Sequence, residues 1–314
     1  MIQLADIQAA AQRIAPYIKR TPLEPSESLS RRLGVETYVK YEMFQKTGSF
    51  KARGAFNRLL SLTPDERKRG VVAVSGGNHA QAIAYAASKL GIRSVIAMPE
   101  NTPQMYLDAT IGYGAVIDLQ PTIAAAFERI EHYTADGMVF VHPFDDELVM
   151  AGQGTVGLEI LEDLPHTSDI VVSIGGGGLI AGVGVAAKST DRNIRVWGVE
   201  TVGADAMSHA LAAGHPVNLG PITSIAKTLG APAVTERSLA YAQKYVESVT
   251  VVPDAEAVEC LVYIHDRLKV ATEPAASCTL AAAERLRDNF GPDTRLVLVL
   301  CGGNTSAADV CSYI

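Results

Sequence analysis

The segment KTGSFKAR, residues 46–53, places an aromatic residue directly before a lysine inside a polar, glycine-containing turn. An exposed loop has no use for Phe50, but a site that shields Lys51 from water does. Desolvation lowers the pKa of a lysine because it disfavours the charged ammonium, and the neutral amine is a nucleophile. A lone lysine is usually solvated, so Lys51 becomes a candidate nucleophile only if other parts of a site accompany it.

A run of four glycines gives the strongest local signal. Residues 173–182 read SIGGGGLIAG, in which an apolar strand leads through Gly175–Gly178 into a helix. Backbone N–H groups without neighbouring side chains can close around an anion, and the helix dipole favours negative charge there. The run lacks the lysine of a GxxxxGKS/T loop, and it departs from GxGxxG because position 180 is Ile. We predict a phosphate site; the alternative is a turn that needs glycines for close packing.

Two further turns carry polar groups at predicted strand ends. The turn SGGNHAQA, residues 75–82, offers the Ser75 hydroxyl, the Asn78 amide and His79, which suit a carboxylate or a phenolic oxygen. The alternative is a local helix cap. The turn CGGN, residues 301–304, presents a cysteine after the strand RLVLVL, and its alternative is a buried thiol. An amine, a phosphate cradle and two polar turns are the set that pyridoxal 5′-phosphate (PLP) requires.

Short apolar runs alternate with helical patterns along most of the chain. Strands are expected at 71–75, 94–99, 115–119, 138–142, 169–174, 195–200 and 295–303, with helices between them. Continuous apolar strands separated by helices predict parallel sheets covered on both faces, which bind ligands at the carboxyl ends of their strands. We predict an α/β fold of two doubly wound domains: a small one at 70–144 and a large one at 1–69 and 145–314.

Composition excludes several kinds of partner. The chain has 314 residues, is 48% hydrophobic and carries a net charge of −7, which argues against nucleic acid and anionic membranes. The N-terminal segment reads as an amphipathic helix and not as a secretory signal, and no apolar run is long enough to span a bilayer. The four cysteines form neither a zinc pattern nor a disulfide framework. We therefore expect a cytoplasmic protein that acts on a small molecule.

Eight motifs carry a resemblance to a known family. They are KTGSFKARGA, SGGNHAQA, AGQGTVGLE, GGGGLIAG, ETVGADA, SIAKTLG, EPAAS and CGGN, in this order. The chain resembles the fold type II, or β-family, PLP enzymes of the serine/threonine dehydratase and serine racemase branch, and its motifs are closest to those of serine dehydratases. This resemblance implies a tryptophan synthase β-like fold with PLP in the cleft between a large cofactor-binding domain and a small substrate-binding domain.

The resemblance also implies roles for individual residues. Lys51 would bind the cofactor aldehyde and act as the catalytic base. The residues that would contact the cofactor are Phe50, Lys51, Asn78, Gly175, Gly176, Gly177, Gly178, Leu179, Ala226 and Cys301. Among them, Asn78 would meet the phenolic oxygen and Cys301 the ring nitrogen. The residues that would grip the substrate carboxylate are Thr47, Ser75, Gly77, Asn78 and His79, with Glu273 behind them.

The expected activity is that of a PLP-dependent ammonia-lyase. It would convert a β-hydroxy L-amino acid of the serine or threonine type into a 2-oxo acid and ammonia by β-elimination. The alternatives are a dehydratase for a bulkier substrate such as phenylserine or a hydroxyectoine-derived amino acid, a serine racemase, a β-replacement enzyme, and a binding protein without catalysis. Gly76 stands where the racemase has a proton-donating serine, which disfavours racemisation.

Relatives hold a cation near ETVGADA and form homodimers, and we expect both features here. Glu200 and the Ala204 carbonyl would be metal ligands. Position 206 is Ala, where racemases have a carboxylate, so a monovalent ion such as K⁺ suits the site better than Mg²⁺.

Overall fold

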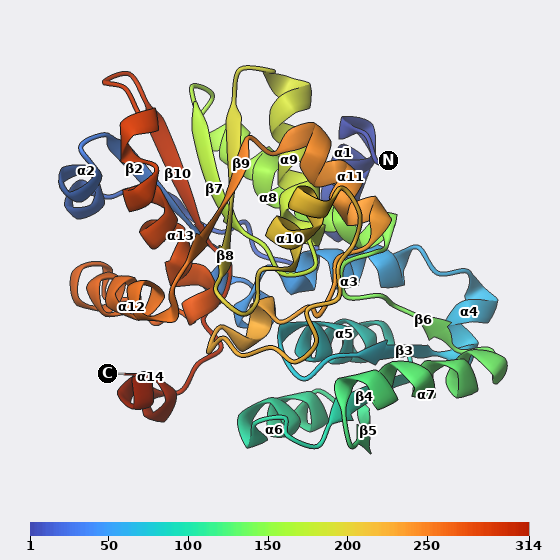
Figure 1. Cartoon of the computed structure of the whole chain (residues 1–314). Coiled ribbons are helices and arrows are strands. Elements are labelled where there is room, and N and C mark those ends of the chain that lie inside the picture. The colour runs from blue at the N-terminus through green and yellow to red at the C-terminus, as the bar shows by residue number, and fades with distance from the viewer. Residues whose placement is uncertain (314) are drawn as a thin grey trace.

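Two mainly parallel sheets form the framework of the molecule. The computed structural model describes residues 1–313 (Figure 1). The six-stranded sheet has the order β1-β2-β10-β7-β8-β9, and only β1 and β2 pair antiparallel. Its strands are β1 (Leu23–Pro25), β2 (Glu36–Tyr41), β7 (Asp169–Ser173), β8 (Arg195–Thr201), β9 (Ser248–Val252) and β10 (Arg295–Leu300). The four-stranded sheet, of order β5-β4-β3-β6, is wholly parallel. Its strands are β3 (Val71–Val74), β4 (Ser94–Pro99), β5 (Val116–Gln120) and β6 (Val139–Phe140).

Helices cover both faces of each sheet. Around the six-stranded sheet lie α1 (Leu4–Ile14), α8 (Glu147–Asp163), α9 (Gly178–Thr190) and α11 (Glu236–Tyr245), and on the other side α2 (Glu27–Leu33), α12 (Asp254–Leu268) and α13 (Pro274–Arg285) (Figure 1). Around the four-stranded sheet lie α3 (Lys51–Leu60), α5 (Asn78–Leu90) and α6 (Gln104–Gly112), with α7 (Ile123–Ala135) on the opposite face. The remaining helices are α4 (Pro64–Arg69), α10 (Ala206–Ala213) and α14 (Ala307–Tyr313), with the 3-10 turns Glu42–Phe44, Lys46–Gly48, Lys227–Leu229 and Arg287–Asn289.

The period of two in a strand explains why β3 is apolar throughout. Val71 and Ala73 pack into the core under α5, whereas Val72 and Val74 pack into the core under α7. All four side chains are buried because helices cover both faces. In helix α1, Ile7, Ala10 and Ile14 are buried at helical spacing, which confirms the predicted amphipathic N-terminal helix.

The predicted fold class is confirmed, and the differences lie at particular strands. The run 138–142 forms only the two-residue strand β6, and the run 295–303 leaves the sheet after Leu300, so that CGGN bends towards the other sheet. Strands β1, β2 and β9 were not predicted. Every strand of the four-stranded sheet lies within 71–140, but the two-domain division remains a prediction. No helix in residues 1–313 has both the length and the apolar composition to cross a membrane.

A buried ionic network anchors the start of α3. The Arg53 guanidinium lies 2.7 Å from a carboxylate oxygen of Glu42 and 2.6 Å from one of Glu159, and the Lys40 ammonium lies 2.6 Å from the other Glu159 oxygen. Arg53, Lys40 and Glu42 are fully buried. These charges tie α3 to β2 and α8 of the larger sheet, while Ala52 and other α3 residues pack beneath the smaller sheet. Helix α3 therefore belongs to two cores.

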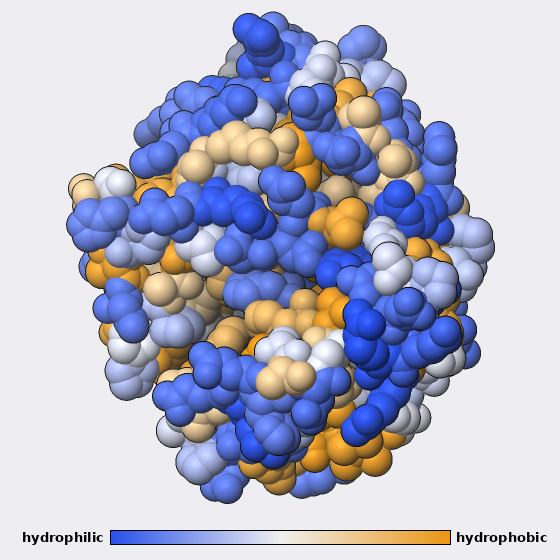
Figure 2. Space-filling view, turned by 90° about the vertical axis from the view of Figure 1, so that its right-hand side faces the viewer, coloured by the Kyte–Doolittle hydropathy of each residue, from blue (hydrophilic) through white to orange (hydrophobic). Residues whose placement is uncertain are grey.

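The outer surface is mostly polar on the face seen in Figure 2. Hydrophilic residues cover most of it, and apolar residues form separate patches between them. This pattern agrees with the net charge of −7 and is ordinary for a protein surface.

Candidate active site

Lys51 is the first residue of α3, and its environment lowers the pKa of the amine to about 8. Burial is the main cause, because it disfavours the ammonium form, while the Cys301 thiol and the Glu273 carboxyl oppose the shift. The Lys51 Nζ donates a hydrogen bond to the Pro143 carbonyl at 2.8 Å. A substantial fraction of the amine is therefore unprotonated near neutral pH, as a nucleophile requires.

Hydrogen bonds place the Lys51 turn against CGGN. The Phe50 amide donates to the Cys301 carbonyl at 3.1 Å, and Ser49 forms a β-bridge with Gly302. Thr47, in the same turn, has a φ of 60°, a left-handed conformation that is rare for a β-branched residue. Such strain is typical of functional loops. The structure thus joins two motifs that lie near opposite ends of the chain.

The glycine run occupies the turn from β7 into α9. Among the described residues, the backbone N–H groups of Gly175, Gly176 and Gly177 donate to no protein acceptor. Gly177 has a φ of 95°, which strains any other residue. A side chain at Gly176 would meet the Phe144 ring at 2.0 Å, and one at Gly175 would meet the Leu229 backbone at 3.2 Å. Both interpretations of the run therefore hold: the glycines allow close packing, and they leave free donors that fit a phosphate.

Replacing Gly176 with alanine is expected to weaken PLP binding by about tenfold or more, the effect of losing one hydrogen bond to a charged group. The new methyl group would overlap the Phe144 ring and displace one wall of the cradle. Gly112→Ala is the matched control, because nothing lies within 4 Å of its added carbon. Absorbance titration of the apoprotein with PLP measures both affinities, and equal values for the two variants would contradict this role of the cradle.

Sequence reasoning missed the segment HPFDD, residues 142–146, on both sides of the Lys51 contact. Its Pro143 carbonyl receives the Lys51 amine, and Phe144 covers the glycine run. The His142 Nδ1 accepts the Asp145 amide at 2.8 Å, and burial lowers the pKa of His142 to about 4, so the ring is a neutral acceptor. The available signal was position: the segment follows β6, at the same sheet edge as the Asn78 turn.

The Asn78 turn opens α5, but its side chains do not cap the helix. Gly77 is the N-cap and makes no side-chain hydrogen bond, so the helix-cap alternative is wrong. The Asn78 amide instead contacts Glu273 at 2.8 Å and Asn304 at 2.7 Å. The Ser75 hydroxyl accepts the Gly77 amide at 3.0 Å. The first N–H groups of α5 remain free to bind a carboxylate.

His79 and Gly76 sit in constrained surroundings. The His79 Nε2 lies 3.0 Å from the Val141 carbonyl, and burial lowers the pKa of the ring to about 3, so it donates as a neutral imidazole. A side chain at Gly76 would lie 2.7 Å from the Thr102 hydroxyl, which is buried without a hydrogen-bond partner among the described residues. A serine at position 76 would therefore compete with Thr102 for the same space.

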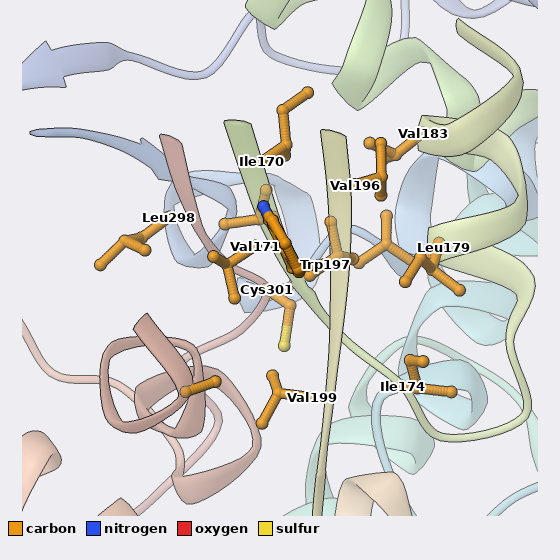
Figure 3. Packing of buried hydrophobic residues seen from close by; sticks show 14 of the residues in the cluster. Ile170, Val171, Ile174, Leu179, Val183, Val196, Trp197, Val199, Leu298 and Cys301 are labelled. Atoms are coloured by element: carbon orange, nitrogen blue, oxygen red, sulfur yellow. The ribbon is translucent and has the colours of Figure 1, made fainter. Parts of the chain in front are cut away.

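Cys301 is a neutral thiol next to the core. It packs with Val171 and Val199 (Figure 3), and burial raises its pKa to about 12. The Ser173 hydroxyl donates to its sulfur at 3.3 Å. Ala226 is also buried, and its own segment approaches both turns: Leu229 packs on Gly175, and Thr228 lies beside Gly77.

The residues expected at a cation site are engaged with each other. Both carboxylate oxygens of Glu200 accept hydrogen bonds, from the Met207 amide at 2.8 Å and from the amide and hydroxyl of Ser208 at 2.8 and 2.7 Å. Burial raises the pKa of Glu200 to about 7. No three metal-binding side chains converge in residues 1–313. This arrangement does not fit a divalent ion, and the Glu200 and Ala204 site remains a prediction.

Comparisons with known proteins agree with this geometry. Residues 14–302 match the family described as pyridoxal-phosphate dependent enzyme. The chain therefore belongs to the family of pyridoxal-phosphate dependent enzymes. An L-threonine ammonia-lyase of Thermotoga maritima is 40% identical over 97% of this chain and 76% of its own, and the catabolic L-threonine dehydratase TdcB of Escherichia coli is 36% identical over 98% and 95%.

Solved structures give the same result. Maize serine racemase superposes with a TM-score of 0.94 at 34% identity, covering 99% of this chain and 96% of its own. A bacterial-type relative, the threonine deaminase from T.th., superposes with a TM-score of 0.91 at 36% identity, covering 97% and 99%. PLP is the cofactor of this family, and the free N–H groups beside a half-buried lysine amine fit it.

Proposed function

We propose that this protein is a PLP-dependent ammonia-lyase that converts a β-hydroxy L-amino acid of the serine or threonine type into a 2-oxo acid and ammonia. The observation that carries the proposal is the Lys51 amine, whose pKa is lowered to about 8 and which is held at the Pro143 carbonyl beside the glycine run. Relatives named threonine ammonia-lyase and threonine dehydratase, which match nearly the whole chain, support the reaction type.

Each part of the site has a task in this reaction. When bound, PLP supplies an electron-withdrawing ring that stabilises negative charge on the substrate α-carbon. The Lys51 amine removes the α-proton and holds it. The N–H groups of Asn78 and His79 at the start of α5 bind the substrate carboxylate. The neutral Cys301 thiol, facing the ring nitrogen, leaves that nitrogen without a full charge, which favours β-elimination over transamination.

The atoms balance without a further reactant. The α-proton and the β-hydroxyl leave as water, and a water molecule is taken up when the amino group is released as ammonia. Serine would give pyruvate and threonine would give 2-oxobutanoate, each with one ammonia. A β-replacement enzyme would instead require an added nucleophile such as a thiol.

The direct experiment is to incubate the purified PLP-loaded protein with a panel of β-hydroxy L-amino acids and no thiol. We expect ammonia and 2-oxo acid in equal amounts from serine or threonine. Phenylserine and other bulky members of the panel test the wider substrate alternative. A preparation that binds PLP but releases product only when a thiol is added would replace this proposal with β-replacement.

The lowered pKa of Lys51 predicts how cofactor loading depends on pH. Below pH 8 the amine is mostly protonated and above pH 8 mostly neutral. The rate at which apoprotein captures PLP should therefore rise between pH 7 and 9 and then level off, whereas a solvated lysine with a pKa of about 10.4 would continue to gain rate beyond pH 10. Stopped-flow absorbance measures the rate, and a midpoint above pH 10 would contradict the desolvated amine.

Three further features stay proposals that rest on the family resemblance. We propose a homodimer, located in the cytoplasm, in which residues 70–144 carry the substrate turn and the remainder of the chain carries the cofactor. Sedimentation of the purified protein measures the first of these directly, and a monomer would refute it.

A further inference from the structure

A chain of hydrogen bonds runs behind the Asn78 amide and is not used by the reaction described so far. The Asn78 Nδ2 donates to a Glu273 carboxylate oxygen at 2.8 Å. The Asn78 Oδ1 accepts from the Asn304 Nδ2 at 2.7 Å, and the same Asn304 nitrogen donates to the Thr47 carbonyl at 2.8 Å. The order of the chain is Glu273, Asn78, Asn304 and Thr47, and it joins four segments that are distant in sequence.

This order allows only one orientation of the Asn78 amide. The oxygen and nitrogen ends of an amide have nearly the same shape, so hydrogen-bond partners must decide which end lies where. A backbone carbonyl only accepts, so the Asn304 atom at the Thr47 carbonyl must be the NH₂ group. Asn78 must then offer its oxygen to Asn304 and its NH₂ to the Glu273 carboxylate. Two groups that can only accept, one at each end, fix the amide between them.

The two outer members are themselves held in place. The Tyr106 hydroxyl, on α6, donates to the Asn304 carbonyl at 2.7 Å. The Asn304 side chain also lies against Gly48, where an added carbon would come within 2.5 Å of its oxygen. Glu273 is buried, its amide donates to the Gly302 carbonyl at 3.2 Å, and its carboxylate lies against Gly302. Neither partner can readily turn away from Asn78.

We infer that Glu273 and Asn304 are positioning residues that keep an N–H group of Asn78 available to the phenolic oxygen of PLP. The inference rests on the proposed function and deepens it. The Asn78 nitrogen has two hydrogens, and the contact with Glu273 uses one of them. The second can donate to the phenolic oxygen, and this bond is stronger when that oxygen is ionised. With the amide reversed, its oxygen would face the phenolic oxygen, and two acceptors would repel each other.

The test replaces the donor at one end without changing its shape. Asn304→Asp removes the donor, so the Asn78 NH₂ must turn towards position 304 and its oxygen must face Glu273. Asn218→Asp is the matched control, since it adds the same charge in an exposed loop and keeps its acceptor contact with the Gly220 amide. At the other end, Glu273→Leu removes the acceptor, whereas Glu273→Gln retains one and should rescue the orientation.

Three measurements on each variant separate positioning from folding. They are the Kd for PLP, the pH midpoint of the visible absorption band of the bound cofactor, and the thermal midpoint of the apoprotein. For Asn304→Asp and Glu273→Leu we expect a Kd raised about tenfold and a band midpoint raised by about one pH unit, the size of a lost hydrogen bond to a charged group. Glu273→Gln and Asn218→Asp should stay within about threefold of wild type.

An unchanged band midpoint in Asn304→Asp and Glu273→Leu would overturn the inference. If only the thermal midpoint fell, the chain of hydrogen bonds would be structural, which also overturns it. Wild-type protein that binds no PLP would instead refute the proposed function itself. The two failures are therefore distinguishable.

Discussion

The Lys51→Ala variant is expected to lose ammonia release on the order of 1,000-fold or more, because one amine serves as cofactor nucleophile and as base. Its fold should survive. The wild-type amine has a pKa lowered by burial, so the folded protein bears a desolvation cost that alanine does not. The thermal midpoint of the apoprotein should therefore stay equal or rise. Steady-state assay of 2-oxo acid and ammonia measures the loss of activity.

Borohydride reduction supplies an independent readout for the same variant. Wild-type protein should gain the mass of reduced PLP at the peptide that contains Lys51, and the variant should gain none. Lys89→Ala, which removes an exposed lysine on α5, should keep both activity and labelling. Retained turnover in Lys51→Ala would refute the assignment of the base.

The Arg53→Met variant is expected to lose about 3–5 kcal/mol of unfolding free energy. Methionine fills much of the space, but it leaves the carboxylates of Glu42 and Glu159 buried without their main partner. Uncompensated buried charge is the costly part, more than the lost attraction itself. Because α3 carries Lys51, PLP binding should weaken together with stability. Urea unfolding of the apoprotein, followed by circular dichroism, measures the change.

Arg285→Met is the matched control for this variant. Arg285 forms a close ion pair with Glu256 at 2.6 Å, but both side chains are about two-fifths exposed. Water solvates the glutamate when its partner is lost, so the expected change is within about 1 kcal/mol. Equal losses in the two variants would show that burial of the Arg53 network does not govern stability.

Sequence patterns predicted the elements whose burial is uniform. Strands β3 and β4 are apolar on both faces, so their runs could be recognised without a partner. Strand β2 was missed because its buried Lys40 is compensated by Glu159, a residue 119 positions away that no local pattern reveals. Strand β9 was missed because it lies at the sheet edge and is only half-buried.

The same distinction holds for the site. Lys51 and the glycine run are contiguous motifs whose chemistry depends on their own backbone, and the structure places both where strands end. The partners of Asn78 lie 195 and 226 residues further along the chain. Such contacts are set by the topology of the sheets, so the role of Asn304 and the Pro143 contact of Lys51 became visible only in three dimensions.

The double membership of α3 limits how parts of this enzyme can be recombined. Its Arg53 is fixed to the larger sheet by charge, whereas Ala52 and Phe56 pack with α5 and β3 of the smaller one. A chimaera that grafts a relative's residues 70–144 onto this chain would cut through that shared packing. The graft must carry the matching apolar residues of α3 along with it, or the lysine at the helix start will lose its support.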